Sequence, residues 1–223
     1  MERVERFERK GHCYAMLPYS RDVFIILVRR AMTIILENIS KSYDGNKVLE
    51  NLNVEIEDGR CYAFIGSKGS GKTTALKIFM GMEKPDEGKV CRMGDYKYPT
   101  LQSAYVSQDG QLNLKKDAIW NVKKAHRWAS KGRAIEELTR FIEPDRQCIP
   151  VSELSVPERR LVELVKALFT PADFIVLDSP FEGMDADTKQ KTIDYLLDIK
   201  GSRPLIIAQK DAEGLDFARK VCL

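Results

Sequence analysis

The sequence predicts an α/β fold, and three observations lead to this prediction. Residues 66–73 read Gly-Ser-Lys-Gly-Ser-Gly-Lys-Thr, which matches the pattern G-x-x-x-x-G-K-[ST] in full. An apolar run of strand length, residues 61–65, precedes this loop, and residues 74–80 follow it with helical spacing. A second apolar run, residues 174–177, ends in Asp178. Alternating strands and helices of this kind favour a parallel sheet covered by helices.

The first 31 residues differ from the rest of the chain. Arg and Glu alternate near the start, and residues 23–28 form a run of six apolar residues. Such a run is too short to span a bilayer and short for the core of a secretory signal, so we expect no integral membrane segment here. Residues 1–31 are either an appendage or an upstream reading of the start codon. The main domain is then expected over residues 32–223, beginning with a strand at residues 33–36 in a strand-rich stretch that extends to residue 65.

The loop at residues 66–73, called the phosphate loop below, predicts binding of a nucleotide phosphate. Its glycines allow backbone turns that point successive N–H groups at one anion. Lys72 adds a positive charge for the β and γ phosphates, and the Thr73 hydroxyl can hold Mg²⁺. The helix that follows is expected to end at Gly81 and to present its positive end to the phosphate.

The later elements complete the predicted sheet and its helices. We expect a turn at residues 85–88, a strand near Tyr105 and helical patterns that run through residues 117–142 and 158–169. A strand at 174–177, a helix near 187–199 and a strand at 205–208 follow. Asp178 stands at the tip of a buried strand, where a carboxylate can reach Mg²⁺ directly or through water. An aspartate that only starts a turn is the alternative.

Composition is typical of a single globular domain with a sizeable core, or of one domain with an appendage. The chain has 223 residues, of which 43% are hydrophobic, and a formal net charge of +3. Basic and acidic residues are interspersed, so no nucleic-acid partner is expected. The five cysteines form no C-x-x-C pair, which argues against a zinc site and a disulfide framework and favours reduced thiols in the cytoplasm.

Further motifs narrow the class of nucleotide-binding protein. Gln108 ends the segment Tyr-Val-Ser-Gln, Ser155 lies in Glu-Leu-Ser-Val-Pro-Glu, and Gly183-Met184-Asp185 follows Asp178. In this order and spacing they resemble the ATP-binding subunit of an ABC transporter over residues 32–223. The resemblance implies a RecA-like P-loop core with an antiparallel β subdomain and a short helical subdomain inserted at about residues 109–160.

The resemblance also implies which residues hold the nucleotide. Tyr43 would stack on adenine, Gln108 would reach the metal and lie where the permease docks, and Ser155 would contact the nucleotide of a facing subunit. Each has a plainer alternative: Tyr43 could brace a turn, Gln108 could cap a strand, and Ser155 could serve only to start a helix. The implied cofactors are ATP and Mg²⁺, with Thr73, Gln108 and Asp178 at the metal. The full implied nucleotide site is Tyr43, Gly66, Ser67, Lys68, Gly69, Ser70, Gly71, Lys72, Thr73, Thr74, Gln108, Ser155 and Asp178.

Three departures from the family pattern predict slow hydrolysis. Ser179 stands where the family has the glutamate that polarises water, and loss of a general base commonly costs about 10²–10⁴-fold in rate. Gln209 stands at the switch-histidine position and cannot carry a proton or a charge. Val156 and Pro157 replace two glycines after Ser155. The segment Ser155-x-x-Glu158 is instead a capping box with proline in the first helical turn.

The sequence therefore predicts an importer-like ATP-binding subunit in which no catalytic constellation is intact. The implied partners are a membrane permease and a second cassette subunit, identical or different, and the implied location is cytoplasmic and peripheral at the inner face of the membrane. A nucleotide-dependent regulatory module is the alternative. A small-molecule kinase or a GTPase is disfavoured because neither needs the residues at 108, 155 and 183–185.

Overall fold

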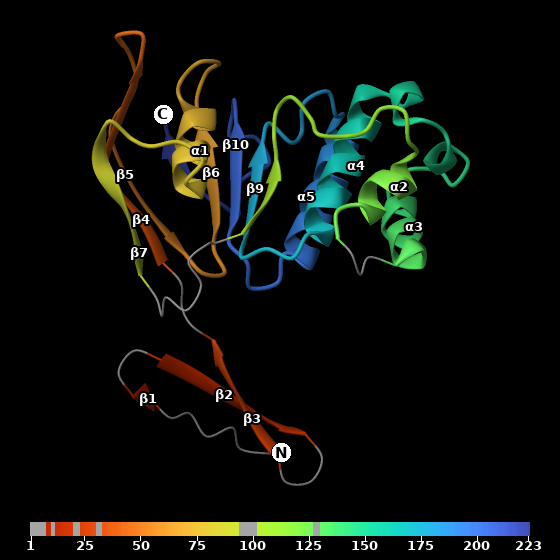
Figure 1. The fold of residues 1–223 in the computed structure, drawn as a ribbon, viewed down its shortest axis with the longest axis horizontal. Coiled ribbons are helices and arrows are strands. Elements are labelled where there is room, and N and C mark those ends of the chain that lie inside the picture. The colour runs from red at the N-terminus through yellow and green to blue at the C-terminus, as the bar shows by residue number, and fades with distance from the viewer. Residues whose placement is uncertain (1–7, 10–11, 20–22, 30–32, 94–101, 127–129) are drawn as a thin grey trace.

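The computed structural model describes residues 8–9, 12–19, 23–29, 33–93, 102–126 and 130–223 (Figure 1). Its centre is a five-stranded sheet of order β11-β6-β10-β9-β8, in which every neighbouring pair is parallel. The strands are β6 Cys61–Ile65, β8 Ser103–Val106, β9 Phe174–Asp178, β10 Leu205–Gln209 and β11 Arg219–Cys222. The predicted α/β fold with a parallel sheet is thus confirmed.

Each face of this sheet packs against its own hydrophobic core. Phe174 and Val176 of β9 lie in one core, and the alternating residues Ile175 and Leu177 lie in the other. Because side chains alternate across a strand, a continuous apolar run is what a strand covered on both faces requires. The rings of Phe79 and Phe174 meet edge to face, with centroids 5.2 Å apart, where α1 (Lys72–Met80) crosses the sheet.

A three-stranded antiparallel sheet of order β5-β4-β7 shares the core on the α1 side. Its strands are β4 Thr33–Tyr43, β5 Asn46–Glu57 and β7 Glu87–Met93. Asp44 and Gly45, at φ 50° and 79°, make the tight turn between β4 and β5, whose twist suits a hairpin. This sheet is the predicted antiparallel subdomain, although β7 was not predicted as a strand.

Helices gather on the opposite face of the parallel sheet. They are α2 Ala118–Lys123, α3 Lys131–Thr139, α4 Val156–Phe169 and α5 Ala186–Ile199, with short 3₁₀ turns at Arg146–Cys148 and Val151–Glu153. The helical pattern predicted through 117–142 is two short helices. Asp117 caps α2 through Trp120 N, and Ser130 caps α3 through Arg133 N. No helix among the described residues is long and apolar enough to cross a membrane.

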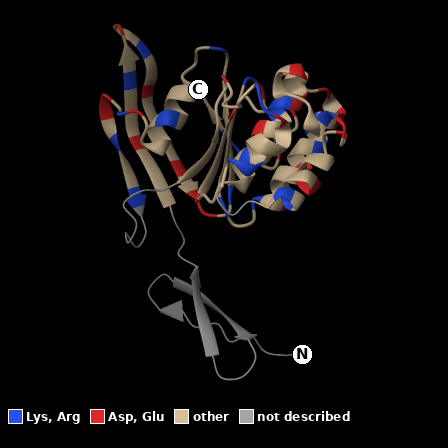
Figure 2. Ribbon diagram, turned by 45° about the vertical axis from the view of Figure 1, so that its right-hand side comes forward, with Lys and Arg blue, Asp and Glu red and all other residues tan. Residues whose placement is uncertain are grey.

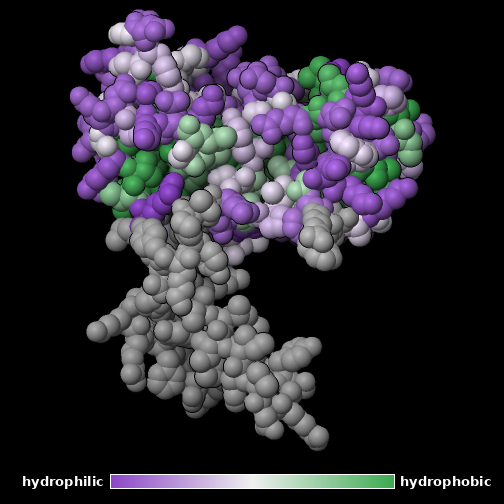
Figure 3. All heavy atoms as spheres, in the orientation of Figure 1, coloured by the Kyte–Doolittle hydropathy of each residue, from purple (hydrophilic) through white to green (hydrophobic). Residues whose placement is uncertain are grey.

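The N-terminal segment forms a separate antiparallel sheet of β1 Glu8–Arg9, β2 His12–Tyr19 and β3 Val23–Arg29. The apolar run at 23–28 thus lies on a strand. In the described part of the main domain, Lys and Arg are interspersed with Asp and Glu (Figure 2). Apolar residues appear on one face in small groups among hydrophilic ones (Figure 3). Both views agree with the interspersed charge pattern of the sequence.

Candidate nucleotide-binding site

The phosphate loop joins the carboxyl end of β6 to the first residue of α1. Gly69 and Gly71 have φ of 88° and 90°, a conformation that favours glycine. A Cβ on Gly71 would also approach within 2.6 Å of the Val48 carbonyl oxygen and 2.7 Å of Leu49 Cδ2. Any side chain at position 71 would therefore push the loop away from β5. Glycine is required at this position both by its positive φ and by the lack of space for a Cβ atom.

The side chain of Lys72 forms hydrogen bonds with three residues of the phosphate loop. Its Nζ donates to the carbonyl oxygens of Gly66 and Ser67, both at 2.6 Å, and to Ser70 Oγ at 3.3 Å. Burial lowers the pKa of this ammonium, and the nearby Asp178 carboxylate opposes that shift. The arrangement holds a partly desolvated ammonium inside the loop, where it can move from carbonyl oxygens to phosphate oxygens.

Thr73 and Asp178 bring two oxygen atoms together across the sheet. Thr73 Oγ1, on α1, donates to Asp178 Oδ2, at the end of β9, over 2.6 Å. Asp178 is only 1% exposed, so its carboxylate is largely removed from water. A hydroxyl and a buried carboxylate in contact fit Mg²⁺, which prefers oxygen ligands.

Groups of three or more His, Cys, Asp or Glu side chains suited to a metal ion are absent from the described residues. A bound Mg²⁺ would therefore depend on Thr73, Asp178 and Gln108, which line one cleft, and on oxygen atoms of the nucleotide. Mg²⁺ in phosphate sites typically takes one or two carboxylates and keeps its remaining positions for phosphate and water. The donor set thus fits a metal that arrives with its nucleotide.

A cleft of about 560 Å³ brings most of the predicted site residues together. Tyr43, the last residue of β4, lies at one side, with Lys41 Nζ 5.4 Å from its ring centroid. Tyr43 is 40% exposed, so its aromatic side chain is accessible to a ligand. The other predicted residues that line the cleft are Lys68, Gly69, Gly71, Lys72, Thr73, Thr74, Gln108, Asp178, Ser179 and Gln209.

Two residues at the departures from the family pattern also face this cleft. Ser179 has φ 52°, the left-handed region, and its N–H donates to Ala208 O over 2.9 Å. The Gln209 Oε1 atom is buried and has no hydrogen-bond partner among the described residues. A buried acceptor without a partner costs free energy, so this amide is available to a ligand that brings a donor such as a water molecule.

Sequence reasoning did not assign three charged residues that line the same cleft: Glu182, Lys210 and Asp211. All three follow the carboxyl ends of β9 and β10, which are neighbours in the sheet. Ligands of open parallel sheets bind outside the carboxyl ends of the strands, so this position along the chain was the available signal.

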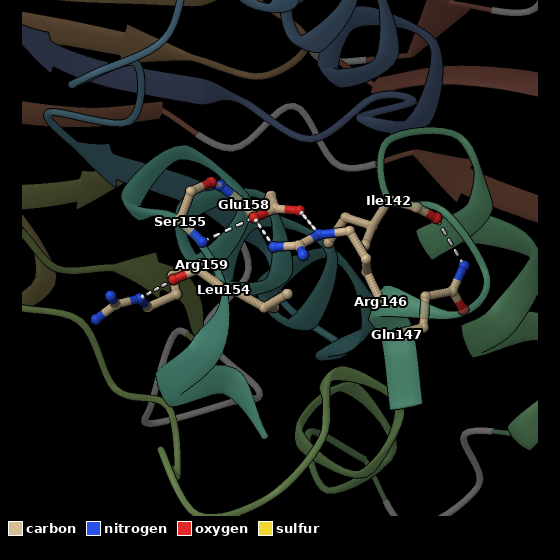
Figure 4. Close-up of polar contacts among 7 residues, drawn as sticks. All are labelled: Ile142, Arg146, Gln147, Leu154, Ser155, Glu158 and Arg159. Carbon is tan, nitrogen blue, oxygen red and sulfur yellow. Dashed lines mark hydrogen bonds and ion pairs between the residues drawn. The ribbon is translucent and has the colours of Figure 1, made fainter. Parts of the chain in front are cut away.

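Ser155 does not line the cleft. It is the N-cap of α4, where its Oγ accepts from Glu158 N and its own N–H donates to Glu158 Oε2, the predicted capping box (Figure 4). Arg146 grips the same carboxylate with Nε and Nη2 at 2.5 and 2.8 Å, which lowers the pKa of Glu158 from 4.5 to about 2. Val156 beside it is 61% exposed. The helix start is therefore closed by hydrogen bonds and an ion pair, and Ser155 lies outside the lining of this chain's own cleft.

The comparisons with known proteins identify a family and several relatives. The sequence model of a family described as "ABC transporter" matches residues 49–182. The chain is 28% identical over 204 residues to the sulfate/thiosulfate import ATP-binding protein CysA of Nephroselmis olivacea. It is 30% identical over 209 residues to the Fe(3+) ions import ATP-binding protein FbpC of Serratia marcescens. These matches cover 85% and 86% of this chain but only 59% and 60% of the relatives.

Solved structures share the fold. A dimeric ATP-binding cassette in a post-hydrolysis state, bound to ADP and Pi, superposes with a TM-score of 0.72 at 24% identity, over 85% of this chain and 94% of that one. A bacterial ABC exporter with ATP bound gives a TM-score of 0.74 at 18% identity, over 86% of this chain and 37% of that one. The fold of this chain is thus that of solved ATP-binding cassettes.

Proposed function

The chain belongs to the ABC transporter family as an ATP-binding cassette, and from this premise we propose that it binds MgATP for a membrane transporter and hydrolyses it slowly or not at all. The observation that carries the binding half of the proposal is the contact of Thr73 Oγ1 with Asp178 Oδ2 at 2.6 Å, with Lys72 inside the loop. In this proposal, Lys72 and the phosphate loop bind the phosphates, and Thr73 and Asp178 bind the metal. Tyr43 stacks on the adenine ring.

Slow hydrolysis is supported by the side chains that line the cleft close to Asp178. Ser179 brings a hydroxyl where the family has a carboxylate, and a neutral hydroxyl is a poor proton acceptor near pH 7. Gln209 can hydrogen-bond to a phosphate or a water molecule but cannot take a proton. Glu182 also lines the cleft and is the acidic side chain to test as a substitute base.

The signature segment, which a second cassette would place against the nucleotide, also departs from the family pattern. In the family, two cassettes sandwich each nucleotide between one phosphate loop and the other subunit's signature. Here the signature positions after Ser155 are Val156 and Pro157, and proline has no N–H to donate. With an identical partner, both sites would combine this signature with Ser179. With a competent partner, each site would carry one of the two defects.

The proposed setting is the cytoplasmic face of a cell membrane, with the cassette peripheral to a permease and paired with a second cassette. The named relatives are import ATP-binding proteins, which supports an importer. The chain spans about three fifths of the length of these relatives, so the transported solute and the partners are not carried over from them.

The second candidate is a regulatory module of the same transporter, in which nucleotide-driven pairing gates transport without powering it. The residues of the cleft also favour this candidate. Groups suited to binding the nucleotide are present, whereas Ser179 replaces the glutamate that would accept a proton. Steady-state phosphate release by the assembled complex separates the two. Release coupled to transport supports a motor subunit, and transport that needs bound ATP without release by this chain's site supports a gate.

The decisive measurement on this chain pairs phosphate release with a matched variant. Wild type and Glu182→Gln should both release phosphate near background. A wild-type rate on the order of 1 s⁻¹, within the usual range of enzymes, would contradict slow hydrolysis. If that rate then vanished in Glu182→Gln, Glu182 would be the base.

A further inference from the structure

Three charged side chains of α4 hold the segment that carries Gln108. Arg160, Glu163 and Lys166 are spaced three residues apart, so they follow one side of the helix. Their partners are main-chain groups of residues 107–111, called here the Gln108 segment, which follows β8. Gln108 itself is exposed, so its side chain is positioned through the backbone.

Arg160 spans two consecutive carbonyl groups. Its Nη1 donates to Ser107 O over 2.7 Å and its Nη2 donates to Gln108 O over 2.9 Å. The same Nη1 donates to Glu163 Oε2 over 2.8 Å. Arg160 is 8% exposed and Glu163 9%, so the pair is buried. The planar guanidinium therefore holds the peptide planes on both sides of the Gln108 Cα atom.

Glu163 and Lys166 fasten the far end of the segment. Glu163 Oε1 accepts from Gln111 N over 2.9 Å, and Lys166 Nζ donates to Gln111 O over 2.7 Å. Within the segment, the Gly110 N–H reaches Ser107 O only at 3.4 Å. The conformation of the Gln108 segment is thus imposed mainly by α4.

We propose that Arg160 and Glu163 are positioning residues that set Gln108 at the metal side of the nucleotide site, so that Mg²⁺ strengthens ATP binding. The inference rests on the proposed function. A buried ion pair adds little net stability compared with an apolar pair of the same size, so fold stability alone is a weak reason for it. Fixing the backbone beforehand removes the entropy cost of ordering Gln108 when the metal binds.

The test is ATP affinity of the full chain, measured by calorimetry with and without Mg²⁺. We expect Arg160→Met to leave metal-free ATP affinity unchanged and to reduce the Mg²⁺ enhancement by about tenfold. Arg159→Met is the matched control, since Arg159 belongs to the same helix turn but donates through Nε to Leu154 O over 2.9 Å. Arg160→Lys keeps the charge and reaches one carbonyl, so it should restore part of the enhancement.

A double-mutant cycle separates positioning from a merely structural role. In a Gln108→Ala background, Arg160→Met should cause no further loss of Mg²⁺ enhancement, because the group it positions is gone. An equal loss in both backgrounds would overturn the inference. So would an unchanged Mg²⁺ enhancement in Arg160→Met alone.

Two further outcomes are distinguishable. If Arg160→Met does not fold, Lys166→Met tests the other end of the segment and should reduce the enhancement in the same direction; an unchanged value would overturn the inference. If wild type binds no ATP in either buffer, the proposed function fails and this inference fails with it. If wild type binds ATP equally well with and without Mg²⁺, only the positioning inference fails.

Discussion

Single residues divide the candidate site into groups suited to binding a nucleotide and positions where the family has catalytic groups. Lys72, Thr73 and Asp178 contact each other or the loop at about hydrogen-bond distance already, so little rearrangement separates this geometry from a phosphate and metal site. Ser179 and Gln209 face the same cleft with neutral side chains. We therefore expect nucleotide binding and nucleotide hydrolysis to respond to substitutions of different residues.

Replacing Lys72 tests the binding half. Lys72→Ala removes a charge-assisted contact to phosphate and should weaken MgATP binding by about 1.5–3 kcal/mol, measured by calorimetry. Lys77→Ala on the exposed side of the same helix is the matched control and should bind like wild type. Equal MgATP affinity in Lys72→Ala and wild type would contradict the phosphate-loop assignment.

Restoring the carboxylate tests the cleavage half. Ser179→Glu returns a general base, but position 179 has a left-handed φ of 52° and the facing signature still presents Val156 and Pro157. We expect little gain in phosphate release from this change alone. A clear gain should appear when Val156→Gly and Pro157→Gly are added, since residues that act as a unit are strongly non-additive. Full activity in the single variant would show that the signature is not limiting.

At the level of secondary structure, helix α4 contacts two functionally relevant segments. Its first turn is closed by Ser155, Glu158 and Arg146, and its next turns hold the Gln108 segment. One helix thus carries both the signature segment, which we expect to face a partner, and the side chains that contact the Gln108 segment.

The acid response of this helix follows from Glu158. Its folded-state pKa, lowered by Arg146 to about 2 from 4.5, means that its stabilisation is present above pH 4.5 and is lost as pH falls toward 2. Glu158→Gln should lower the free energy of unfolding by about 1 kcal/mol at pH 7, a modest value because the pair is partly exposed. Urea unfolding should show this difference shrinking below pH 4.5.

Glu153→Gln is the control for that experiment, since it removes the same charge from an exposed side chain two residues before Ser155. We expect it to change stability much less than Glu158→Gln at pH 7. A difference between wild type and Glu158→Gln that stays constant from pH 7 to pH 3 would contradict the role of the Arg146 contact.

Elements with a strong local signal could be predicted from the sequence. β6 is a fully apolar run, α1 ends at Gly81 with φ 76°, and α4 begins at its capping box as predicted. β7 and β11 were missed because they are edge strands with exposed polar residues, so neither shows a clear period. The split between α2 and α3 was missed although Ser130 is a recognisable N-cap.

The part of the candidate site that consists of sequence motifs could be predicted from the sequence. The phosphate loop and Asp178 lie at strand ends, so their meeting follows from parallel topology. The approach of Glu182, Lys210 and Asp211 depends on the order of β9 and β10 in the sheet, and the grip of Arg160 on residues 107 and 108 depends on contacts 52–53 residues apart in the chain. No local pattern encodes such contacts.

For the whole molecule, the main domain should bind nucleotide without the first 31 residues. Among the described strands, β1, β2 and β3 pair only with one another, and the residues that line the nucleotide cleft lie within residues 43–211. A chain starting at Met32 should fold and bind MgATP with unchanged affinity, by circular dichroism and calorimetry. A chain starting at Glu37 is the control, since it removes the buried Ile34 and Leu36 of β4 and should be destabilised.

Sheet order also dictates when the site can form during synthesis. The phosphate loop follows β6 and Asp178 ends β9, yet these strands are not neighbours, because β10 lies between them. Thr73 and Asp178 therefore come together only after residues 205–209 have left the ribosome and inserted into the sheet. Domains fold as the chain emerges from its N-terminal end, so we expect a nucleotide that needs both Thr73 and Asp178 to stabilise the domain only late in its synthesis.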